Sequence, residues 1–293
     1  MTAFAFIGFG ELGSVLAKGL RENGAEGLRA YVRPRPDQRA LALRLAAAHV
    51  ERAPSVEIAV RDADVVLVVV PGSAVVEVAR GAAPHVRAGS LYVDAATAAP
   101  EAKGEAGALV GDAGGLYVDA AVLGAVAADG YAVPFLASGP GAEAWADLMA
   151  PYGLCLETMD GPAGSASRVK LLRSVYMKGR DALVLEMLVA ARRYGVEREL
   201  IESVKGAGEG VPFPELADRV LRSLAVHAGR RSEELEAAAE VLRAAGIEPV
   251  VAEAGAERLR RPAELGLRER FGGERPEAVE DVLRAIDELG GSL

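Results

Sequence analysis

Cysteine and histidine are scarce in this sequence, which limits the chemistry that it can carry. Cys155 is the single cysteine, and His49, His85 and His227 are the three histidines. One cysteine excludes an intrachain disulfide and a cysteine-based metal site, and it is typical of a reducing compartment. His49 and His85 have no companions at metal-ligand spacing, so we expect no metal site.

Long apolar runs are also missing. The run Val65–Pro71 falls far short of the roughly 20 residues that a membrane-spanning helix needs. The first residues, Thr2–Gly8, carry no basic leader and run directly into a strand-like pattern, so we expect no signal peptide. Together with the single cysteine, these features predict a soluble, cytoplasmic protein.

The sequence has no basic region. Its 293 residues include 33 basic and 42 acidic side chains, which gives a net charge of −9. Residues 1–157 hold 12 basic and 18 acidic side chains, and the remainder holds 21 and 24. Neither half suits a phosphate backbone, so we expect no nucleic-acid partner. An anionic small molecule would have to meet local positive charge.

Lysine is rare as well. The five lysines are Lys18, Lys103, Lys170, Lys178 and Lys205, and the other basic residues are arginines. Each lysine is therefore a candidate for a specific role, although compositional drift is the simpler explanation for any one of them.

Apolar residues are plentiful, at 51% of the chain, and the length suits two domains of roughly 100–200 residues each. In the first half, short β-rich runs alternate with helical stretches, and several runs are apolar throughout, as in parallel strands buried on both faces. This alternation predicts an α/β domain, a Rossmann-type doubly wound parallel sheet with right-handed crossovers. The expected strands are Ala3–Ile7, Leu28–Val32, Val65–Val70, Leu91–Asp94, Leu116–Ala121, Val133–Ala137 and Leu154–Thr158. The expected helices are Leu12–Asn23, Pro36–Ala48, Ala74–Ala83, Pro100–Val110 and Ala142–Ala150.

The pattern becomes helical after the turn-like segment Gly161–Gly164. We therefore expect two domains, the α/β domain over 1–160 and an all-α domain over 161–293. The segment Ser165–Tyr194 contains no proline and keeps helical periodicity, which predicts a long interdomain helix. The other expected helices are Arg198–Lys205, Glu215–His227, Ser232–Ala245, Val250–Leu259 and Glu277–Leu289, with Gly206–Pro214 as the clearest loop.

A glycine-rich motif lies between the first expected strand and helix. It reads Gly8-Phe9-Gly10-Glu11-Leu12-Gly13, the G-x-G-x-x-G pattern in the strand–turn–helix context that it requires. The first glycine permits the tight turn, the second lets the backbone approach a pyrophosphate, and the third lets helix and strand pack closely. The phosphates would bind at the helix N-terminus. The motif predicts a dinucleotide cofactor.

The end of the second expected strand indicates which dinucleotide is bound. An NAD site usually has a carboxylate there, whereas this chain has Arg33 and Arg35. Arginines can hold a 2′-phosphate through charge-assisted hydrogen bonds, so NADP is favoured over NAD. The alternative is that one or both are solvated loop residues. Val70 and Pro71, at the end of a later strand, are expected to form another wall of the cofactor cleft.

Four motifs occur along the chain in a fixed order. They are the glycine loop, Asp94–Pro100, Tyr117–Gly124, and Gly161–Gly164 with Lys170 six residues further on. In this order they resemble the β-hydroxyacid dehydrogenase family, relatives of 6-phosphogluconate dehydrogenase. The resemblance covers roughly residues 3–190. The segment Lys170–Gly179 looks more like a poorly characterised branch of that superfamily.

The resemblance implies that Lys170 is the general acid/base. Oxidising an alcohol by hydride transfer requires the hydroxyl proton to leave, and reduction requires one to arrive. A lysine in a dehydrated cleft near another cation has a lowered pKa and can serve. By the same resemblance, Thr97 lines the nicotinamide or substrate pocket. The simpler reading of Lys170 is a solvent-exposed helix lysine.

Two departures from the family pattern concern the substrate. The family's asparagine three residues after the lysine is here Arg173, followed by Ser174. Both can share the helix face of Lys170, with Arg173 as an anion clamp or in a structural ion pair. The family's serine-glycine-glycine is here Leu123-Gly124-Ala125. We expect Leu123 and Gly124 to shape the pocket without the usual carboxylate contact.

His227 opens a compact cationic cluster, His227–Arg231, at an expected helix boundary. It could supply substrate contacts, including contacts to the site of a partner subunit. The alternative is a helix C-cap with surface charge.

The sequence therefore predicts an NADP-dependent oxidoreductase that moves a hydride to or from a small polar, anionic hydroxy or oxo acid. We expect a homodimer formed through the helical domain. An imine reductase or an oxidative decarboxylase on the same fold remains an enzyme alternative. A non-catalytic NADP-binding sensor is the alternative from another class.

Overall fold

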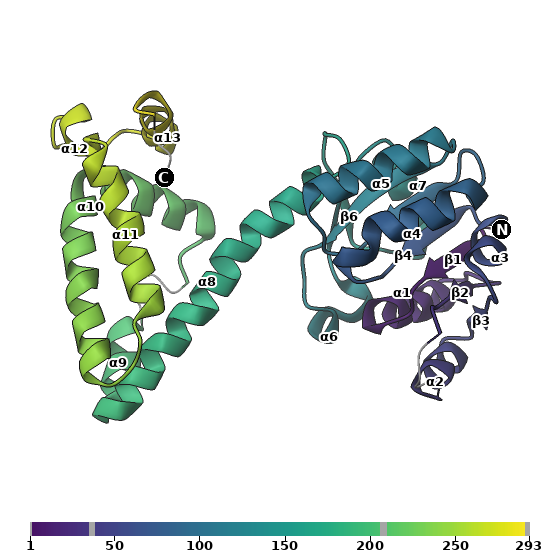
Figure 1. Ribbon diagram of the computed structural model, residues 1–293, viewed down its shortest axis with the longest axis horizontal. Coiled ribbons are helices and arrows are strands. Elements are labelled where there is room, and N and C mark those ends of the chain that lie inside the picture. The colour runs from purple at the N-terminus through teal and green to yellow at the C-terminus, as the bar shows by residue number, and fades with distance from the viewer. Residues whose placement is uncertain (1, 35–38, 206–209, 291–293) are drawn as a thin grey trace. The chain divides into compact units, whose positions relative to one another are not determined.

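The structure, a computed structural model, describes residues 2–34, 39–205 and 210–290 and divides into two compact units, Met1–Val175 and Tyr176–Leu293 (Figure 1). The first unit contains the strands β1 (Phe4–Ile7), β2 (Arg29–Tyr31), β3 (Glu51–Arg52), β4 (Val65–Val68), β5 (Leu91–Asp94), β6 (Leu116–Val122), β7 (Phe135–Ser138) and β8 (Leu156–Thr158). Its α-helices are α1 (Glu11–Glu22), α2 (Arg39–Ala47), α3 (Val56–Val60), α4 (Val75–Ala82), α5 (Pro100–Asp112), α6 (Val126–Asp129), α7 (Ala142–Met149) and the start of α8 (Ser165–Tyr194). Among the described residues, no helix is both long and apolar enough to cross a membrane.

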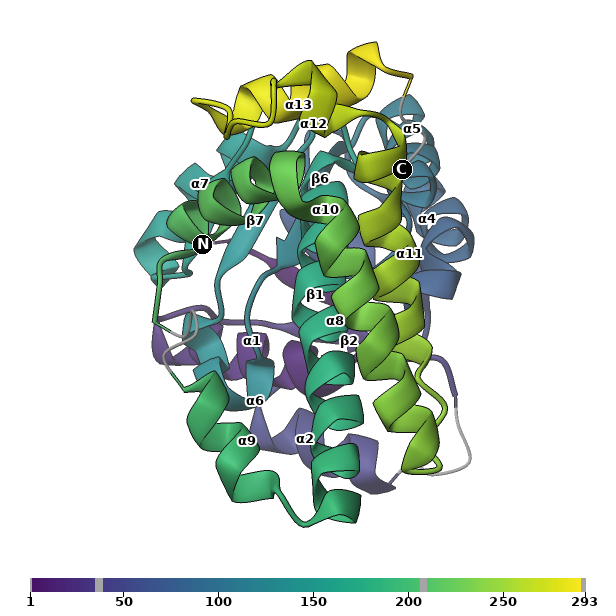
Figure 2. The ribbon, with the colours of Figure 1, turned by 90° about the vertical axis from the view of Figure 1, so that its left-hand side faces the viewer.

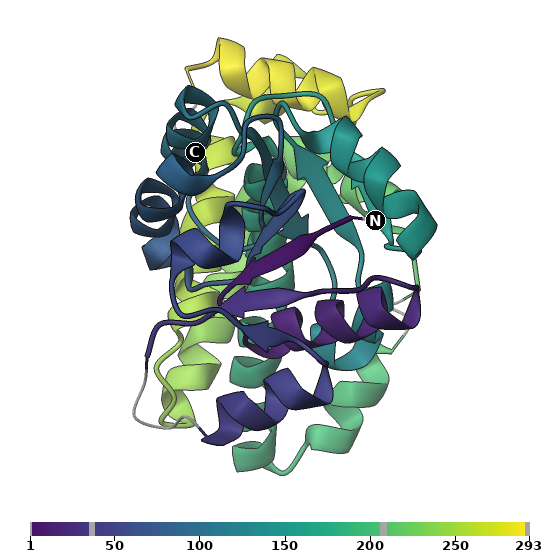
Figure 3. The ribbon, with the colours of Figure 1, turned by 90° about the vertical axis from the view of Figure 1, so that its right-hand side faces the viewer.

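The first unit is built on one sheet with the strand order β3-β2-β1-β4-β5-β6-β7-β8. The strands from β3 to β6 in this order are parallel, which confirms the Rossmann-type prediction. Figure 3 shows β1 and β2, in purple, side by side with α1 beside them. The prediction of a parallel sheet is wrong at the far edge, because β7 runs antiparallel to β6 and β8 follows the direction of β7. The link from β6 to β7 holds only α6 and one 3-10 turn, too little for a parallel crossover.

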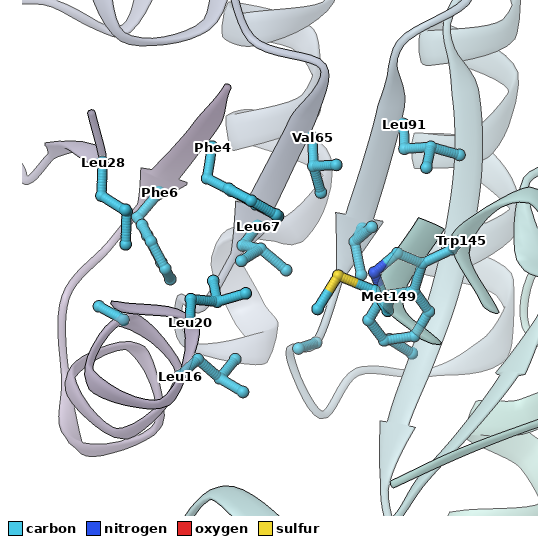
Figure 4. Packing of buried hydrophobic residues seen from close by; sticks show 14 of the residues in the cluster. Phe4, Phe6, Leu16, Leu20, Leu28, Val65, Leu67, Leu91, Trp145 and Met149 are labelled. Carbon is cyan, nitrogen blue, oxygen red and sulfur yellow. The ribbon is translucent and has the colours of Figure 1, made fainter. Parts of the chain in front are cut away.

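Alternate residues of each central strand feed two separate hydrophobic cores. Phe4 and Phe6 of β1 pack on the face that α1 and α7 cover, whereas Ala5 and Ile7 pack on the face of α3, α4 and α5. Figure 4 shows Phe6 gathered with the side chains of α1, and Trp145 of α7 further along the same face. Burial on both faces explains why these strands read as continuous apolar runs.

The direction of the strands places their following loops together. β1, β4, β5 and β6 are parallel neighbours, so the segments after them meet at one edge of the sheet. The glycine loop follows β1, Val69–Pro71 follows β4, Thr97 follows β5 and Leu123 follows β6. Ligands of open α/β sheets bind at this edge.

The second unit is helical. It contains the rest of α8 together with α9 (Glu197–Val204), α10 (Phe213–Ala244), α11 (Val250–Glu264), α12 (Leu267–Arg270) and α13 (Val279–Glu288). Figure 2 shows α10 and α11 side by side, with α12 and α13 across one end of the pair. Small side chains such as Ala239 and Ala252 make up much of its cores, which lets the helices approach closely.

The predicted break between two helices at His227–Arg231 is wrong, because α10 runs through this segment without interruption. A glycine inside a helix costs only about 1 kcal/mol relative to alanine. At Gly229, an added Cβ would lie 3.6 Å from the Cβ of Ala263 in α11. Gly229 therefore marks a close helix contact and not a helix end. The expected C-cap at this cluster is likewise wrong.

Candidate active site

The glycine loop begins at a position that only glycine can occupy without strain. Gly8 follows β1 with φ of +87°, and its N–H donates to the Tyr31 carbonyl oxygen at 2.9 Å. An added Cβ would lie 2.5 Å from the Val69 carbonyl oxygen. The turn therefore depends on both the backbone freedom and the missing side chain of Gly8.

Of the next two glycines, Gly10 faces open space and Gly13 allows a close contact. A Cβ at Gly10 would meet no heavy atom of the described residues within 4 Å, so the space in front of α1 is open. A Cβ at Gly13 would lie 3.0 Å from Cγ2 of Val69, so this glycine lets α1 pack closely. Free N–H groups at the start of α1 can face an anion in this open space. The loop fits a dinucleotide pyrophosphate.

The residues between the glycines have different surroundings. Phe9 is buried and packs edge-on against Phe6 at 5.7 Å between ring centroids. Leu12 is half-buried against the same core, and Glu11 is exposed in the first turn of α1. The side chains of Phe9 and Leu12 therefore belong to the hydrophobic core.

A cavity of about 1020 Å³ opens beside the loop. Glycine-loop residues, the end of β2, helix α2 and the segment after β4 line it, which brings together the predicted Gly8, Phe9, Gly10, Arg33, Val70 and Pro71. Arg44 of α2 and Glu77 of α4 also line it, and sequence reasoning missed both. Neither belongs to a motif, and only the folding of α2 and α4 against the strand ends places them here.

Arg33 has a partner that the sequence did not suggest. Its Nη2 lies 2.7 Å from Oε1 of Glu77, and both side chains are largely exposed. An ion pair this exposed contributes little to stability, so Arg33 can exchange Glu77 for another anion at small cost. Arg35 lies outside the described residues.

Lys170 and Thr97, which are 73 residues apart in sequence, meet at the carboxyl edge of the sheet. The ammonium of Lys170 donates to Oγ1 of Thr97 at 2.7 Å. The pKa of Lys170 is lowered by burial and by the nearby charges of Lys103 and Arg173, while Asp119 opposes the shift. Lowering the pKa increases the fraction of Lys170 that is neutral near pH 7.

A buried charge network lies behind this pair. Asp94 and Asp119 are neighbours in register on β5 and β6, and Lys103 of α5 reaches between them with its side chain fully buried. The Nζ of Lys103 donates to the Asp94 carbonyl oxygen at 2.8 Å and lies 3.0 Å and 3.4 Å from the two Oδ1 atoms. The hydroxyl of Tyr117 donates to Asp94, and this contact and burial raise the pKa of Tyr117. Sequence reasoning noted Lys103 only as one of few lysines.

The same network holds the beginning of α8. Asp119 accepts the N–H groups of Gly164 and Ser167 at 3.1 Å and 2.8 Å, and the hydroxyl of Ser167 at 2.6 Å. Ser138 of β7 accepts the N–H of Ala166 at 3.0 Å. These side chains satisfy the N–H groups that a helix N-terminus leaves free. Lys170, one turn further along α8, is thereby fixed relative to the sheet.

Comparison with known proteins decides the family. Residues 3–155, just over half of the chain, match the family described as the NAD binding domain of 6-phosphogluconate dehydrogenase. The chain belongs to the 6-phosphogluconate dehydrogenase-like family of NAD(P)-binding oxidoreductases. The resemblance drawn from its motifs is confirmed. Residues 191–261 match a domain of unknown function, DUF1932.

Several proteins are similar to this family member. A conserved hypothetical protein from Sinorhizobium meliloti is 33% identical with a TM-score of 0.60, covering 89% of this chain and 88% of that one. A conserved protein of unknown function, described as structurally similar to 3-hydroxyacid dehydrogenases, is 31% identical with a TM-score of 0.59, covering 89% and 98%. An imine reductase from Myxococcus stipitatus in complex with NADP+ is 20% identical with a TM-score of 0.75 over 98% and 100%, which shows a shared fold. An uncharacterized protein from Methanothermus fervidus is 35% identical over 89 residues, and this match spans 30% of the chain and 35% of that protein.

The other predicted substrate residues of this 6-phosphogluconate dehydrogenase-like protein lie on α8, in the loop after β6 and on α10. Arg173 is exposed on α8, three residues after Lys170, and its charge acts on that lysine. The hydroxyl of Ser174 donates to the Lys170 carbonyl oxygen at 3.0 Å, within the helix. Leu123 and Gly124 follow β6, and an added Cβ at Gly124 would lie 2.3 Å from Oδ2 of Asp129. Gly124 is therefore required by a close approach within its own loop.

His227 lies on the second unit, in the middle of α10. Burial lowers its pKa, and the charges of Arg230 and Arg275 add to the effect. A contact between His227 and substrate stays a prediction.

Two glycine variants should separate folding from cofactor binding. Gly10→Ala should fold normally but bind NAD(P)H at least about tenfold more weakly, because its Cβ enters the space reserved for the pyrophosphate. Gly8→Ala should lose about 1–3 kcal/mol of unfolding free energy through backbone strain. Binding is measured by fluorescence titration of NAD(P)H, and unfolding by the emission of Trp145, the single tryptophan, which is buried in the first unit. Unchanged binding in Gly10→Ala would show that the phosphates lie elsewhere.

Proposed function

We propose that this protein is an NADPH-preferring oxidoreductase that moves a hydride to or from a small polar, anionic hydroxy or oxo acid, with Lys170 as the proton donor and acceptor. The observation that carries this proposal is the contact between Lys170 and Thr97. Their 2.7 Å hydrogen bond lies at the sheet edge that also bears the glycine loop. A dinucleotide held by that loop has its reactive end at the same edge in sheets of this kind.

The chemistry divides between cofactor and protein. A bound nicotinamide supplies or accepts the hydride. Neutral Lys170 takes the hydroxyl proton as an alcohol becomes a carbonyl, and the ammonium returns a proton in the reverse direction. Its lowered pKa supports both roles, because both forms are then accessible closer to pH 7. The Thr97 hydroxyl oxygen orients the Lys170 side chain by accepting a hydrogen bond from its nitrogen.

An anionic substrate suits the charges beside Lys170. Arg173 lies on the same helix face and presents a guanidinium, which binds carboxylates and phosphates through two hydrogen bonds. The loop at Leu123 and Gly124 offers no hydroxyl where the family has a serine, so Arg173 takes over recognition of the anion. Ser174 keeps oxygen lone pairs to accept a hydrogen bond from substrate.

The preference for NADPH rests on arginines at the adenosine end of the cavity. Arg33 is exposed and bound to a single carboxylate, that of Glu77, in the described residues. Arg44 lines the same cavity. The 2′-phosphate carries more charge than a carboxylate and offers more acceptor oxygens, so it competes well for Arg33.

Replacing Lys170 should abolish turnover and spare cofactor binding. Lys170→Met is expected to lower kcat by about 100-fold or more, since general acid–base catalysis contributes 10²–10⁴-fold. The dissociation constant of NADPH should stay within about twofold, because the cofactor cavity does not include this residue. Lys178→Met, an exposed lysine on the same helix, is the control and should leave both quantities unchanged. A sensor protein would show no dependence of its output on Lys170.

The value of kcat/KM should change with pH in opposite directions for oxidation and reduction. Oxidation needs neutral Lys170, so kcat/KM for the alcohol falls as the pH drops through the pKa of Lys170. Reduction needs the ammonium, so kcat/KM for the carbonyl falls as the pH rises through that pKa. Because the pKa is lowered, both inflections should lie below the ordinary value for lysine. Profiles without these inflections would remove Lys170 from the proton transfer.

Arg33 should decide between the two dinucleotides. Arg33→Ala is expected to weaken NADPH binding by about 10–100-fold, the loss of one charged hydrogen bond, and to leave NADH binding unchanged. Glu77→Gln should strengthen NADPH binding, because the competing carboxylate is gone. Arg80→Ala is the matched control on α4, since Arg80 pairs with Glu105 away from the cavity lining. Equal effects of Arg33→Ala on both cofactors would reject the phosphate contact.

The substrate class is tested by following NADPH absorbance with hydroxy acids, sugar acids and their oxo forms. Cyclic imines belong in the same panel, because an imine reductase shares this fold. Release of carbon dioxide from a hydroxy acid would identify the decarboxylating alternative. Turnover of imines alone would replace the hydroxy or oxo acid in the proposal.

We also propose that the protein is a homodimer through its helical region. The part of α8 in the second unit carries exposed apolar side chains, which mark association surfaces when they gather on one element. They include Leu183, Val184, Leu185 and Val189. Leu185→Glu should therefore convert a dimer to a monomer in size-exclusion chromatography with light scattering. Leu43→Glu, on α2 and about as exposed as Leu185, is the control and should leave the dimer intact. A monomeric wild-type protein would reject this part of the proposal.

A further inference from the structure

Lys103 is a fully buried charged side chain that the proposed proton transfer leaves without a role. Its relative exposure is 0%, as is that of Asp119, and Asp94 is 1% exposed. Lysine is almost never fully buried unless it is paired, because removing an ammonium from water is costly. Replacing all three charged residues by packed hydrophobic residues would often cost no stability, so the buried ion pairs of Lys103 call for a reason beyond stability.

The three protons of the Lys103 ammonium face two segments that hold the candidate site. On one side, Lys103 contacts the carbonyl and carboxylate oxygens of Asp94. Asp94 in turn accepts the N–H of Ala96 at 2.9 Å, which fixes the loop leading to Thr97. On the other side, Lys103 contacts Asp119, which holds the first turn of α8. Lys103 therefore joins the segment that carries Thr97 to the helix that carries Lys170.

We propose that Lys103 is a positioning residue that sets the approach of Thr97 to Lys170 and acts on the Lys170 ammonium as a fixed positive charge. This inference rests on the proposed role of Lys170 as the proton donor and acceptor. Lys103 touches neither substrate nor cofactor in this proposal and acts through its two carboxylate partners.

The charges around Lys170 predict the direction in which its pKa should change when a neighbour is replaced. Lys103 and Arg173 disfavour the ammonium form of Lys170, whereas Asp119 favours it. Removing the Lys103 charge should therefore raise the pKa of Lys170, and removing the Asp119 charge should lower it. General loosening of the fold would hydrate Lys170 and raise its pKa in either variant. The downward shift expected on loss of Asp119 is thus one that a purely structural defect does not produce.

The variants are chosen so that Asp119 is the one carboxylate that loses the Lys103 ammonium, while it keeps its hydrogen bonds from the first turn of α8. Lys103→Gln/Asp94→Asn removes one positive and one negative charge and keeps amide groups that can hydrogen-bond to the same neighbours. Asp94→Asn alone is the matched control, because it keeps Lys103. Asp119→Asn removes the opposing charge and keeps an oxygen that can accept from the first turn of α8.

The pKa of Lys170 is read directly by NMR of protein labelled in its lysine side chains. Only five lysines contribute signals, and Lys170→Met identifies the one that belongs to Lys170. We expect the pKa of Lys170 to be about one unit higher in Lys103→Gln/Asp94→Asn than in Asp94→Asn, and about one unit lower in Asp119→Asn than in wild type. The double variant should also lose kcat by about tenfold relative to Asp94→Asn at the optimum pH of each, through the lost alignment with Thr97.

The proposal is overturned if the double variant and Asp94→Asn share one Lys170 pKa, or if Asp119→Asn raises it. If Lys103→Gln/Asp94→Asn does not fold, as judged by Trp145 emission, Lys103→Met/Asp94→Asn takes its place with a side chain of similar length. The titration needs no turnover, so it separates this inference from the proposed function. Lys170→Met with full activity would reject the proposed function, while the pKa shifts would still report whether Lys103 acts on Lys170.

Discussion

The ion pairing of Lys103 with Asp94 and Asp119 is the constraint on which the candidate site depends. Two aspartates stand in register on neighbouring strands, in the interior of the protein, where like charges repel strongly. The ammonium between them compensates both. Removing one partner from such a buried group costs about 3–5 kcal/mol, because it leaves a charge unpaired. The end of β5 and the middle of β6 are therefore joined by the ammonium of Lys103.

From this contact the two parts of the site are built by different means. The cofactor side is made of backbone, because Gly8 and Gly10 offer close approach and open space while the neighbouring side chains are buried. The proton-transfer side is made of side chains whose positions follow from Asp119 and Asp94. The backbone geometry of the glycine loop is set by the strand and the turn, so it does not depend on the buried side-chain network. The pairing of Lys170 with Thr97 joins residues from two elements and needs the buried network to keep them in register.

The sequence carried much of this arrangement in patterns that are local. The bounds of β5 and α8 were predicted as the structure has them, since apolar runs and a proline-free helical stretch depend on neighbours in the chain. The glycine loop was found by its own spacing between strand and helix, and Lys170 by the order of the motifs. The continuity of α10 and the reversal of β7 were missed, because they depend on the packing of Gly229 on α11 and on how the chain returns after β6. Local periodicity predicts neither the continuity of α10 nor the direction of β7.

Lys103 shows the same limit in the site itself. The sequence marked it as a rare lysine and placed Asp94 and Asp119 within two different motifs, yet nothing in the spacing brings the three together. Their meeting requires the register of β5 against β6 and the crossing of α5 over that face. A charge can influence the pKa of another group without sharing a helix face or a motif with it, as long as the medium between them excludes water. A residue that tunes Lys170 in this way is visible only once the chain is folded, even though the lysine that it tunes is visible in the sequence.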